Sequence, residues 1–214
     1  MGEVFDVYDE NEQWVGTAER IEVHARGLWH RTFHCWLARP GEDGEARVLF
    51  QRRSAGKDTN PGRYDITAAG HLVAGESPRD AVRELEEELG VAVSFEELTP
   101  IGTVREQLEG SARGIAYIDR EISDVFACVA DWKLSRLRLQ EEEVAGVYEA
   151  RADELIALIR GERMELLAQG VTLLDGRLSA SEAIVTKDSF VPRKDDYYID
   201  VFLRLAELAG HSAT

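Results

Sequence analysis

The stretch that decides the fold is residues 70–91, GHLVAGESPRDAVRELEEELGV. Within it, residues 84–88 hold four glutamates in five consecutive positions. Like charges at i,i+3 and i,i+4 on a helix repel by about 0.2–0.5 kcal/mol per pair, so an ordinary surface helix rarely has this composition. The run therefore indicates a site, with a solvated acidic face as the plain alternative.

Local signals in this stretch predict a loop followed by a helix. Gly70 and Gly75 bracket the loop. Ser77 is suited to the N-cap and Pro78 to the first helical position. Gly90 is suited to end the helix, because glycine readily adopts the left-handed conformation found there. The glutamates therefore belong to one helix.

The helical period sorts these glutamates by face. Glu84, Glu87 and Glu88 stand at i, i+3 and i+4, so they share one face, whereas Glu86 points elsewhere. Together with Glu76 at the helix entrance, they offer the carboxylate oxygens that Mg²⁺ or Mn²⁺ prefers. This face is the predicted metal site.

The spacing of these residues resembles the Nudix box, the signature of the Nudix hydrolases. That pattern is Gly, five residues, Glu, seven residues, then Arg-Glu-apolar-x-Glu-Glu-x-Gly-apolar. Only six residues, 77–82, fill the second interval here, so the loop-to-helix junction must absorb the difference. The matching residues are Gly70, Glu76, Arg83, Glu84, Leu85, Glu87, Glu88, Gly90 and Val91.

The resemblance implies a fold, a reaction and a cofactor. The implied fold is α/β, a Nudix-type α/β/α sandwich with a mixed sheet, and the implied reaction is hydrolysis of a diphosphate bond in a small X-diphosphate-Y compound. Mg²⁺ is the implied cofactor, with Mn²⁺ as the other candidate. The roles carried over are metal binding and catalysis by Glu84, Glu87 and Glu88, support of a box carboxylate by Arg83, and substrate contact at Gly70.

Residues outside the box resemble one branch of the family, the isopentenyl-diphosphate isomerases and their hydrolase-like relatives. The strand-like run WHRTFHCWLA, residues 29–38, places His30 at the position of a metal-ligating histidine, and Gly70-His71 matches the branch's Gly-His pair. Asp119-Arg-Glu121 resembles its acidic pair, which makes Glu121 a candidate ligand or general base. His24 lies six residues before His30 where that branch has seven, so it is not in the predicted set.

Three cations cluster in a chain that has few of them. Arg52, Arg53 and Lys57 lie in QRRSAGKDTNPGRYD, residues 51–65, which resembles the branch's phosphate-facing loop. They are candidate contacts for substrate phosphates, with plain surface charge as the alternative. Because side chains alternate along a strand, at most one of Arg52 and Arg53 points at the site.

The residue before Gly70 distinguishes the isomerase reaction from hydrolysis. The isomerases need a cysteine directly before the Gly-His pair to move a proton, and this chain has Ala69 there. Cys35 and Cys128 lie in apolar runs and are predicted to be small buried residues. The leading hypothesis is therefore a hydrolase. The alternatives are an isopentenyl-diphosphate isomerase-like enzyme and a non-catalytic ligand-binding Nudix domain.

Composition narrows the partners. The sequence has 25 basic and 41 acidic residues, a net charge of −16. This charge argues against nucleic acid or an anionic membrane as the main partner, so a small-molecule diphosphate is expected. The N-terminus has no apolar signal region and no disulfide framework is implied, which predicts a cytoplasmic protein. The resemblance leaves a homodimer open.

Hydrophobic periodicity predicts how the chain is organised. Residues 1–24 are expected to form a hairpin, residues 25–160 the Nudix domain, and residues 161–214 a C-terminal helical extension with a terminal helix at 197–209. Residues 190–198 are expected to cover the pocket, form a dimer surface or brace the fold. The strands are expected at 29–38, 47–52, 64–68, 93–98, 103–107, 123–129 and 144–148, with a helix at 152–160.

Overall fold

Strand β3, Trp29–Pro40, runs through the middle of the molecule, and its alternating side chains fill two cores. The computed structural model describes residues 2–112 and 114–210. Phe33, Cys35 and Leu37 belong to one core, while Trp36 and Ala38 belong to the other. This alternation follows from the two-residue period of a strand that is covered on both faces.

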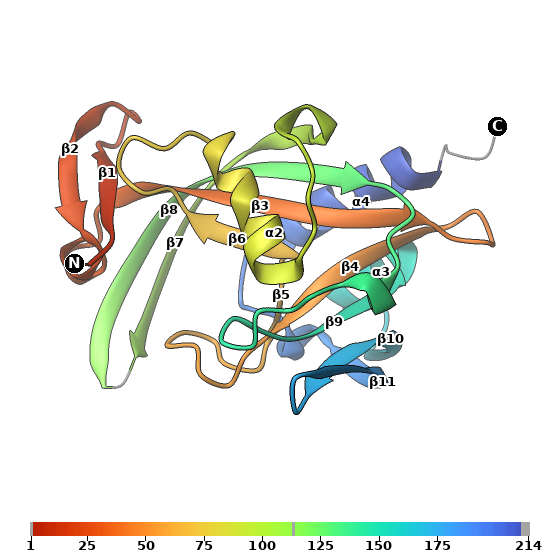
Figure 1. The fold of residues 1–214 in the computed structure, drawn as a ribbon. Coiled ribbons are helices and arrows are strands. Elements are labelled where there is room, and N and C mark those ends of the chain that lie inside the picture. Colours follow the sequence, from red (N-terminus) through yellow and green to blue (C-terminus); the bar gives the residue numbers. More distant parts are fainter. Residues whose placement is uncertain (1, 113, 211–214) are drawn as a thin grey trace.

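The described residues form one eleven-stranded mixed sheet. Strand β8, Ile115–Val129, runs parallel to β3, and the other pairings between the described strands are antiparallel. The N-terminal hairpin lies at one end of β3, as Figure 1 shows. The remaining strands are β1 (Val4–Tyr8), β2 (Trp14–Glu19), β4 (Ala46–Arg53), β5 (Tyr64–Asp65), β6 (Ala68–His71), β7 (Thr99–Ala112), β9 (Val144–Arg151), β10 (Glu165–Leu174) and β11 (Arg177–Thr186).

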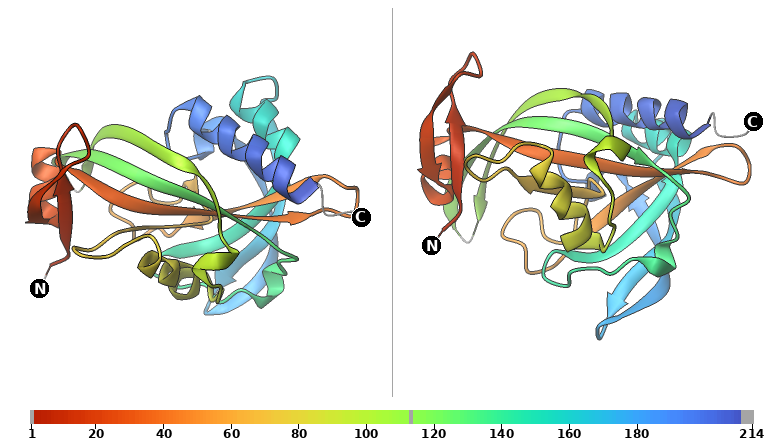
Figure 2. Two further views of the ribbon diagram at one scale, coloured as in Figure 1. Left: turned by 90° about the horizontal axis from the view of Figure 1, so that it is seen from above. Right: turned by 45° about the horizontal axis from the view of Figure 1, so that its top comes forward.

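Helices cover both faces of the sheet and confirm the predicted sandwich (Figures 1 and 2). Helix α2, Arg83–Leu89, lies on one face, where Leu85 and Leu89 join the core of Phe33. Helices α3, Ala152–Ile159, and α4, Asp195–Gly210, lie together on the other face. A fourth helix, α1, Arg20–Arg26, follows β2 directly.

The box helix begins later than the sequence indicates. A 3-10 turn, Asp80–Val82, precedes α2, so the helix starts at Arg83 rather than at Pro78. Ser77 does not cap it, because its hydroxyl and backbone N–H both donate to the Asp80 carboxylate. Gly90 does end the helix, in the left-handed conformation with φ of 69°. The 3-10 turn occupies the junction at which the box is one residue short.

The prediction of a helical extension is half wrong. Strands β10 and β11 form a hairpin between α3 and α4, and β10 pairs with β9 in the main sheet. The turn is Asp175-Gly176, whose positive φ values of 49° and 70° suit a two-residue hairpin. Helix formers such as Leu166 and Ala168 adopt a strand here because the edge of β9 supplies hydrogen bonds and a core.

Two shorter predictions also need correction. Residues 93–98 were expected as a strand but contain a 3-10 turn, Phe95–Glu97, closed by reciprocal hydrogen bonds between Ser94 and Glu97. Residues 64–68 split between β5 and β6. The other expected strands are present and longer at one or both ends. Cys35 and Cys128 are free and buried, as expected.

Within residues 2–112 and 114–210, no helix combines the length and the apolar character that crossing a membrane requires.

Phe202 should dominate the packing of α4 on the sheet. Its ring is fully buried and meets Trp36 at a centroid distance of 5.3 Å. Replacing Phe202 by Ala is expected to lower the free energy of unfolding by about 3–5 kcal/mol, because it leaves a cavity. Urea denaturation measures this loss. The neighbouring change Leu203→Ala, at a side chain that is 43% exposed, should cost less than about 1 kcal/mol.

Candidate active site

One cavity of about 560 Å³ contains most of the residues that the sequence singled out. Its wall combines the carboxylates of α2, the Gly70-His71 end of β6, and β8 residues 119 and 121. The loop after β4 and the segment before α4 complete the wall. Parts of the chain more than 100 residues apart therefore meet in a single hollow.

The register of three strands sets the geometry of the first group of side chains, which reaches the cavity through His71 and Asp119. β8 pairs with β3 so that Glu121 lies opposite His30, and β6 pairs with the other edge of β3 so that His71 lies opposite Thr32. Helix α1 adds His24 from above β8. Three histidines and Asp119 consequently converge.

The convergence is tight enough to hold a cation. His24, His30, His71 and Asp119 each offer a ligand atom, and these atoms all lie within 4.8 Å of one another. The Nε2 atoms of His24 and His30 both lie 3.5 Å from Asp119 Oδ1. His71 Nε2 lies 3.8 Å from Glu121 Oε1. Of the predicted ligands, His30 and His71 are therefore brought together.

Backbone carbonyls orient two of these rings. His24 Nδ1 donates to Arg20 O at 2.9 Å, and His30 Nδ1 donates to Leu28 O at 3.1 Å. With the proton on Nδ1, each Nε2 turns a lone pair toward the group, as metal-bound histidines require. Phe5 of β1 stacks on the rings of His30 and His71, at centroid distances of 5.3 and 4.9 Å.

The buried atoms of this group fit a metal. His30 Nε2, His71 Nε2 and Asp119 Oδ1 are buried without a hydrogen-bond partner among the described residues, and a coordinated cation would satisfy all three. Burial lowers the pKa of His30 and, further, that of His71, which favours the neutral imidazoles that bind metals. A set of three imidazoles and one carboxylate is typical of transition metals such as Zn²⁺ or Mn²⁺ rather than Mg²⁺.

The second group is the carboxylate face of α2. Glu88 is buried, accepts a hydrogen bond from Gln51 Nε2 at 3.4 Å, and has a pKa raised to about 8 by burial and by Glu84. Burial also raises the pKa of Glu84. Glu84 packs directly on Gly70, where a Cβ would lie 2.4 Å from Glu84 Oε1. Only glycine leaves room for this carboxylate against β6.

Arg83 holds the other carboxylates of the box in place. Its Nη1 donates to Glu84 at 2.6 Å and to Glu87 at 3.1 Å, while Nε and Nη2 donate to the two oxygens of Glu76. Glu76 also accepts the Val73 backbone N–H at 3.0 Å. Glu76 is thus engaged on both sides, and Glu87 lies at the rim with a half-exposed side chain. The most buried box carboxylates, Glu84 and Glu88, face the cavity.

Glu121 and two of the predicted cations also line the cavity. Burial, followed by the charge of Asp119, raises the pKa of Glu121 to about 8. Arg53 bonds to Asp65 at 3.1 Å, and Lys57 pairs with Glu143. Arg52 is exposed and bonds to Gly62 O instead. Of the two arginines, only Arg53 faces the site, which agrees with the alternation argument.

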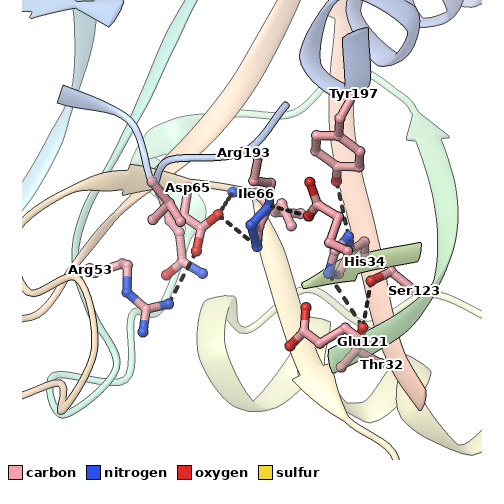
Figure 3. Close-up of polar contacts among 12 residues, drawn as sticks. Thr32, His34, Arg53, Asp65, Ile66, Glu121, Ser123, Arg193 and Tyr197 are labelled. Carbon is pink, nitrogen blue, oxygen red and sulfur yellow. Dashed lines mark hydrogen bonds and ion pairs between the residues drawn. The ribbon is translucent and has the colours of Figure 1, made fainter. Parts of the chain in front are cut away.

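Sequence reasoning missed three residues of the cavity region. His24 was set aside because of its spacing, yet it completes the histidine group. His34, four residues after His30 on the same strand, was given no role and lines the cavity. Arg193 reaches the cavity from the segment before α4 (Figure 3). The signal for Arg193 was weak, a single arginine in the irregular FVPRKDD run.

Comparisons with known proteins agree on one family. The NUDIX domain model matches residues 7–168. An uncharacterized Nudix hydrolase of Clostridium acetobutylicum is 36% identical over 197 residues, which cover 92% of this chain and 93% of that protein. An isopentenyl-diphosphate Delta-isomerase of Streptomyces coelicolor is 36% identical over 145 residues, covering 67% and 68%. The similarity to both Nudix hydrolases and proteins named as isomerases confirms the resemblance to that branch.

Solved structures support the fold. A Deinococcus radiodurans structure is similar with a TM-score of 0.55 at 19% identity, covering 74% of this chain and 90% of its own. A MutT protein from Methanosarcina mazei Go1 is similar with a TM-score of 0.50 at 19% identity, covering 84% and 94%.

The contact between Gly70 and Glu84 can be tested directly. The change Gly70→Ala should displace the Glu84 carboxylate, because the added Cβ would meet it at 2.4 Å. We expect Mg²⁺ affinity to fall about tenfold, a loss of about 1.4 kcal/mol, as measured by calorimetry. Gly102→Ala is the control, since nothing lies within 4 Å of a Cβ there. Unchanged affinity in Gly70→Ala would contradict the arrangement.

The histidine group predicts a metal site whose occupancy can be measured without any enzyme activity. Replacing His71 by Gln is expected to weaken Mn²⁺ binding to the metal-stripped protein about tenfold or more, because one ligand is lost. Titration calorimetry and the shift in melting temperature on adding Mn²⁺ measure the effect. His34→Gln, on the same strand as His30 but outside the group, should keep its Mn²⁺ affinity. Equal losses in the two variants would argue against this ligand set.

Proposed function

Because this chain belongs to the Nudix family, we propose that it is a divalent-metal-dependent pyrophosphohydrolase acting on a small X-diphosphate-Y compound, such as a nucleoside diphosphate derivative. The observation that carries the proposal is the shared cavity. It is lined by buried carboxylates that suit a cation, by His71 and Asp119 of the histidine group that suits another, and by the cations Arg53 and Lys57. A diphosphate needs all three kinds of contact, because its charge must be neutralised on several oxygens.

Each side chain has a task that its position supports. Glu84 and Glu88 would hold Mg²⁺, with Glu87 at the rim, and a bound divalent cation neutralises phosphate charge and acidifies a bound water. Arg83 fixes Glu84 and Glu87, so these two carboxylates need little rearrangement. Arg53 and Lys57 approach from the loop after β4 and would contact the phosphates.

Glu121 is the best-placed described carboxyl for accepting a proton from the attacking water. It lines the cavity together with His71 and Asp119 of the histidine group and with Arg193 of the segment before α4. The geometry for a proton acceptor requires reach of the water first and a suitable pKa second. Glu121 is inside the cavity, whereas other candidate bases such as Glu76 are fully engaged by Arg83 and Val73.

The isomerase alternative lacks a cysteine thiol in the described cavity wall to carry the proton. Ala69 lies beside Gly70 and offers no titratable group. Cys35 and Cys128 both belong to the core under α2, where burial raises the pKa of each thiol. Relatives named as isomerases keep this alternative open to test. The non-catalytic alternative is disfavoured by the retained glutamate face of α2.

The test is phosphate-coupled turnover with Mg²⁺ on nucleoside diphosphate derivatives, dinucleoside polyphosphates, coenzyme A and isopentenyl diphosphate. We expect hydrolysis of at least one compound, and Glu88→Gln should lower its kcat about 100-fold or more, equivalent to about 2.7 kcal/mol of transition-state stabilisation. Glu86→Gln is the matched control, because Glu86 is on the same helix but exposed to solvent.

The outcomes separate the three hypotheses. Turnover that is lost in Glu88→Gln and kept in Glu86→Gln supports the hydrolase. Metal binding without turnover of any compound would favour the non-catalytic module. Conversion of isopentenyl diphosphate to its isomer would overturn the argument from Ala69.

A further inference from the structure

The wall of the cavity next to α4 differs chemically from the glutamate face. Arg193 and His34 both line it, with Arg193 on the segment before α4 and His34 on β3. Their side chains are almost completely buried, with 7% exposure for the Arg193 side chain and 2% for His34. Figure 3 shows both on the same side of Glu121. None of the metal-binding roles above uses either residue.

Hydrogen bonding determines which nitrogen of His34 has the proton. Trp36 Nε1 donates to the Tyr197 hydroxyl oxygen at 3.1 Å. That hydroxyl lies 3.0 Å from His34 Nδ1. Because Thr32 gives its own hydrogen to Ser123, Thr32 Oγ1 can only accept at His34 Nε2, and the Tyr197 hydroxyl then donates to Nδ1. The proton of the neutral ring is then on Nε2. Its one described partner is Thr32 Oγ1, at a distance of 3.5 Å, and Thr32 in turn donates to Ser123. His34 is therefore a weakly engaged N–H donor on the cavity wall.

Arg193 also has N–H groups that lack a hydrogen-bond acceptor. Its Nη2 lies 3.5 Å from Asp65 Oδ1, and its Nε lies 3.8 Å from Glu106 Oε2. Asp65 is already bonded to Arg53 and to the Ile66 backbone N–H. Among the described residues, Arg193 Nε and Nη1 are buried without a hydrogen-bond partner. The ion pairs neutralise the guanidinium charge but leave its hydrogen-bonding capacity open.

We propose that Arg193 and His34 form a subsite for a second anionic group, a carboxylate or a phosphate, on the X part of the substrate. This inference rests on the proposed diphosphate hydrolysis. The guanidinium Nη1, which has no partner among the described residues, can donate to either anion, and the imidazole N–H adds a second donor. A hydrocarbon X would leave these buried donors unpaired, so the wall selects against it.

Matched pairs of diphosphates test the subsite. Coenzyme A and dephospho-coenzyme A differ by one phosphate, and UDP-glucuronate and UDP-glucose differ by one carboxylate. We expect the wild type to prefer the anionic member of at least one pair about tenfold or more in kcat/KM. Arg193→Gln should abolish that preference by lowering kcat/KM for the anionic member, while the neutral member changes less than about twofold. The pair that responds distinguishes phosphate from carboxylate.

Two further variants control for charge and for fold. Lys194→Gln removes a neighbouring positive charge on an exposed side chain and should keep the preference. Arg193→Lys keeps the charge but not the planar guanidinium group, so this variant should keep only part of the preference for the anionic member. If Arg193→Gln does not fold, the double variant Glu106→Gln/Arg193→Gln is tested in its place, because it removes both members of the ion pair between Arg193 and Glu106. Circular dichroism and melting temperature verify folding.

Binding separates failure of the subsite from failure of the proposed function. Calorimetry measures the affinity of the wild type and Arg193→Gln for both members of each pair without needing turnover. If no compound is hydrolysed but the wild type alone binds the anionic member more tightly, the subsite stands and the hydrolase proposal fails. If the wild type has no preference in rate or binding, or if the preference survives in Arg193→Gln, the subsite is overturned.

Discussion

The rest of the site depends on the position of β3 between β8 and β6. The parallel pairing with β8 places His30 opposite Glu121, and the antiparallel pairing with β6 places His71 opposite Thr32. A slip of one residue in either pairing would turn these side chains to the opposite face of the sheet. The two cores prevent such a slip, because Phe33 and Trp36 would then exchange environments. Hydrophobic packing thus fixes the geometry of polar groups that do little for stability themselves.

Burying the carboxylates of α2 in the wall of the cavity has an energetic cost. Burial raises the pKa of both Glu84 and Glu88, which means that the folded protein disfavours their charged forms. Arg83 offsets part of this cost through its contacts with Glu76, Glu84 and Glu87, but it does not touch Glu88 in any described hydrogen bond. A cation at this face would relieve the remainder. The fold therefore holds the carboxylates in a state that a metal would stabilise.

Local sequence periodicity was enough to predict the parts of the site that lie on one element. The shared face of Glu84, Glu87 and Glu88 follows from the helical period, and the opposite directions of Arg52 and Arg53 follow from the strand period. The roles assigned to these residues stay predictions. His24 and Arg193 could not be placed in this way, because each reaches the cavity from a separate element whose position depends on tertiary packing. The β10–β11 hairpin was misread for the same reason: the edge of β9 overrides the helical preference of its leucines.

The cavity wall offers two kinds of group to a ligand, and this division bears on what the molecule can bind. Buried carboxylates and imidazoles offer lone pairs, so cations are the matching ligands. Arg193 and His34 offer N–H groups, so anions match. The first kind comes from the box and the strands next to it, whereas Arg193 comes from the segment beyond residue 168, outside the part of the chain that the family model matches. Phosphate chemistry and recognition of X would then reside in different parts of the chain, which allows one to vary while the other is kept.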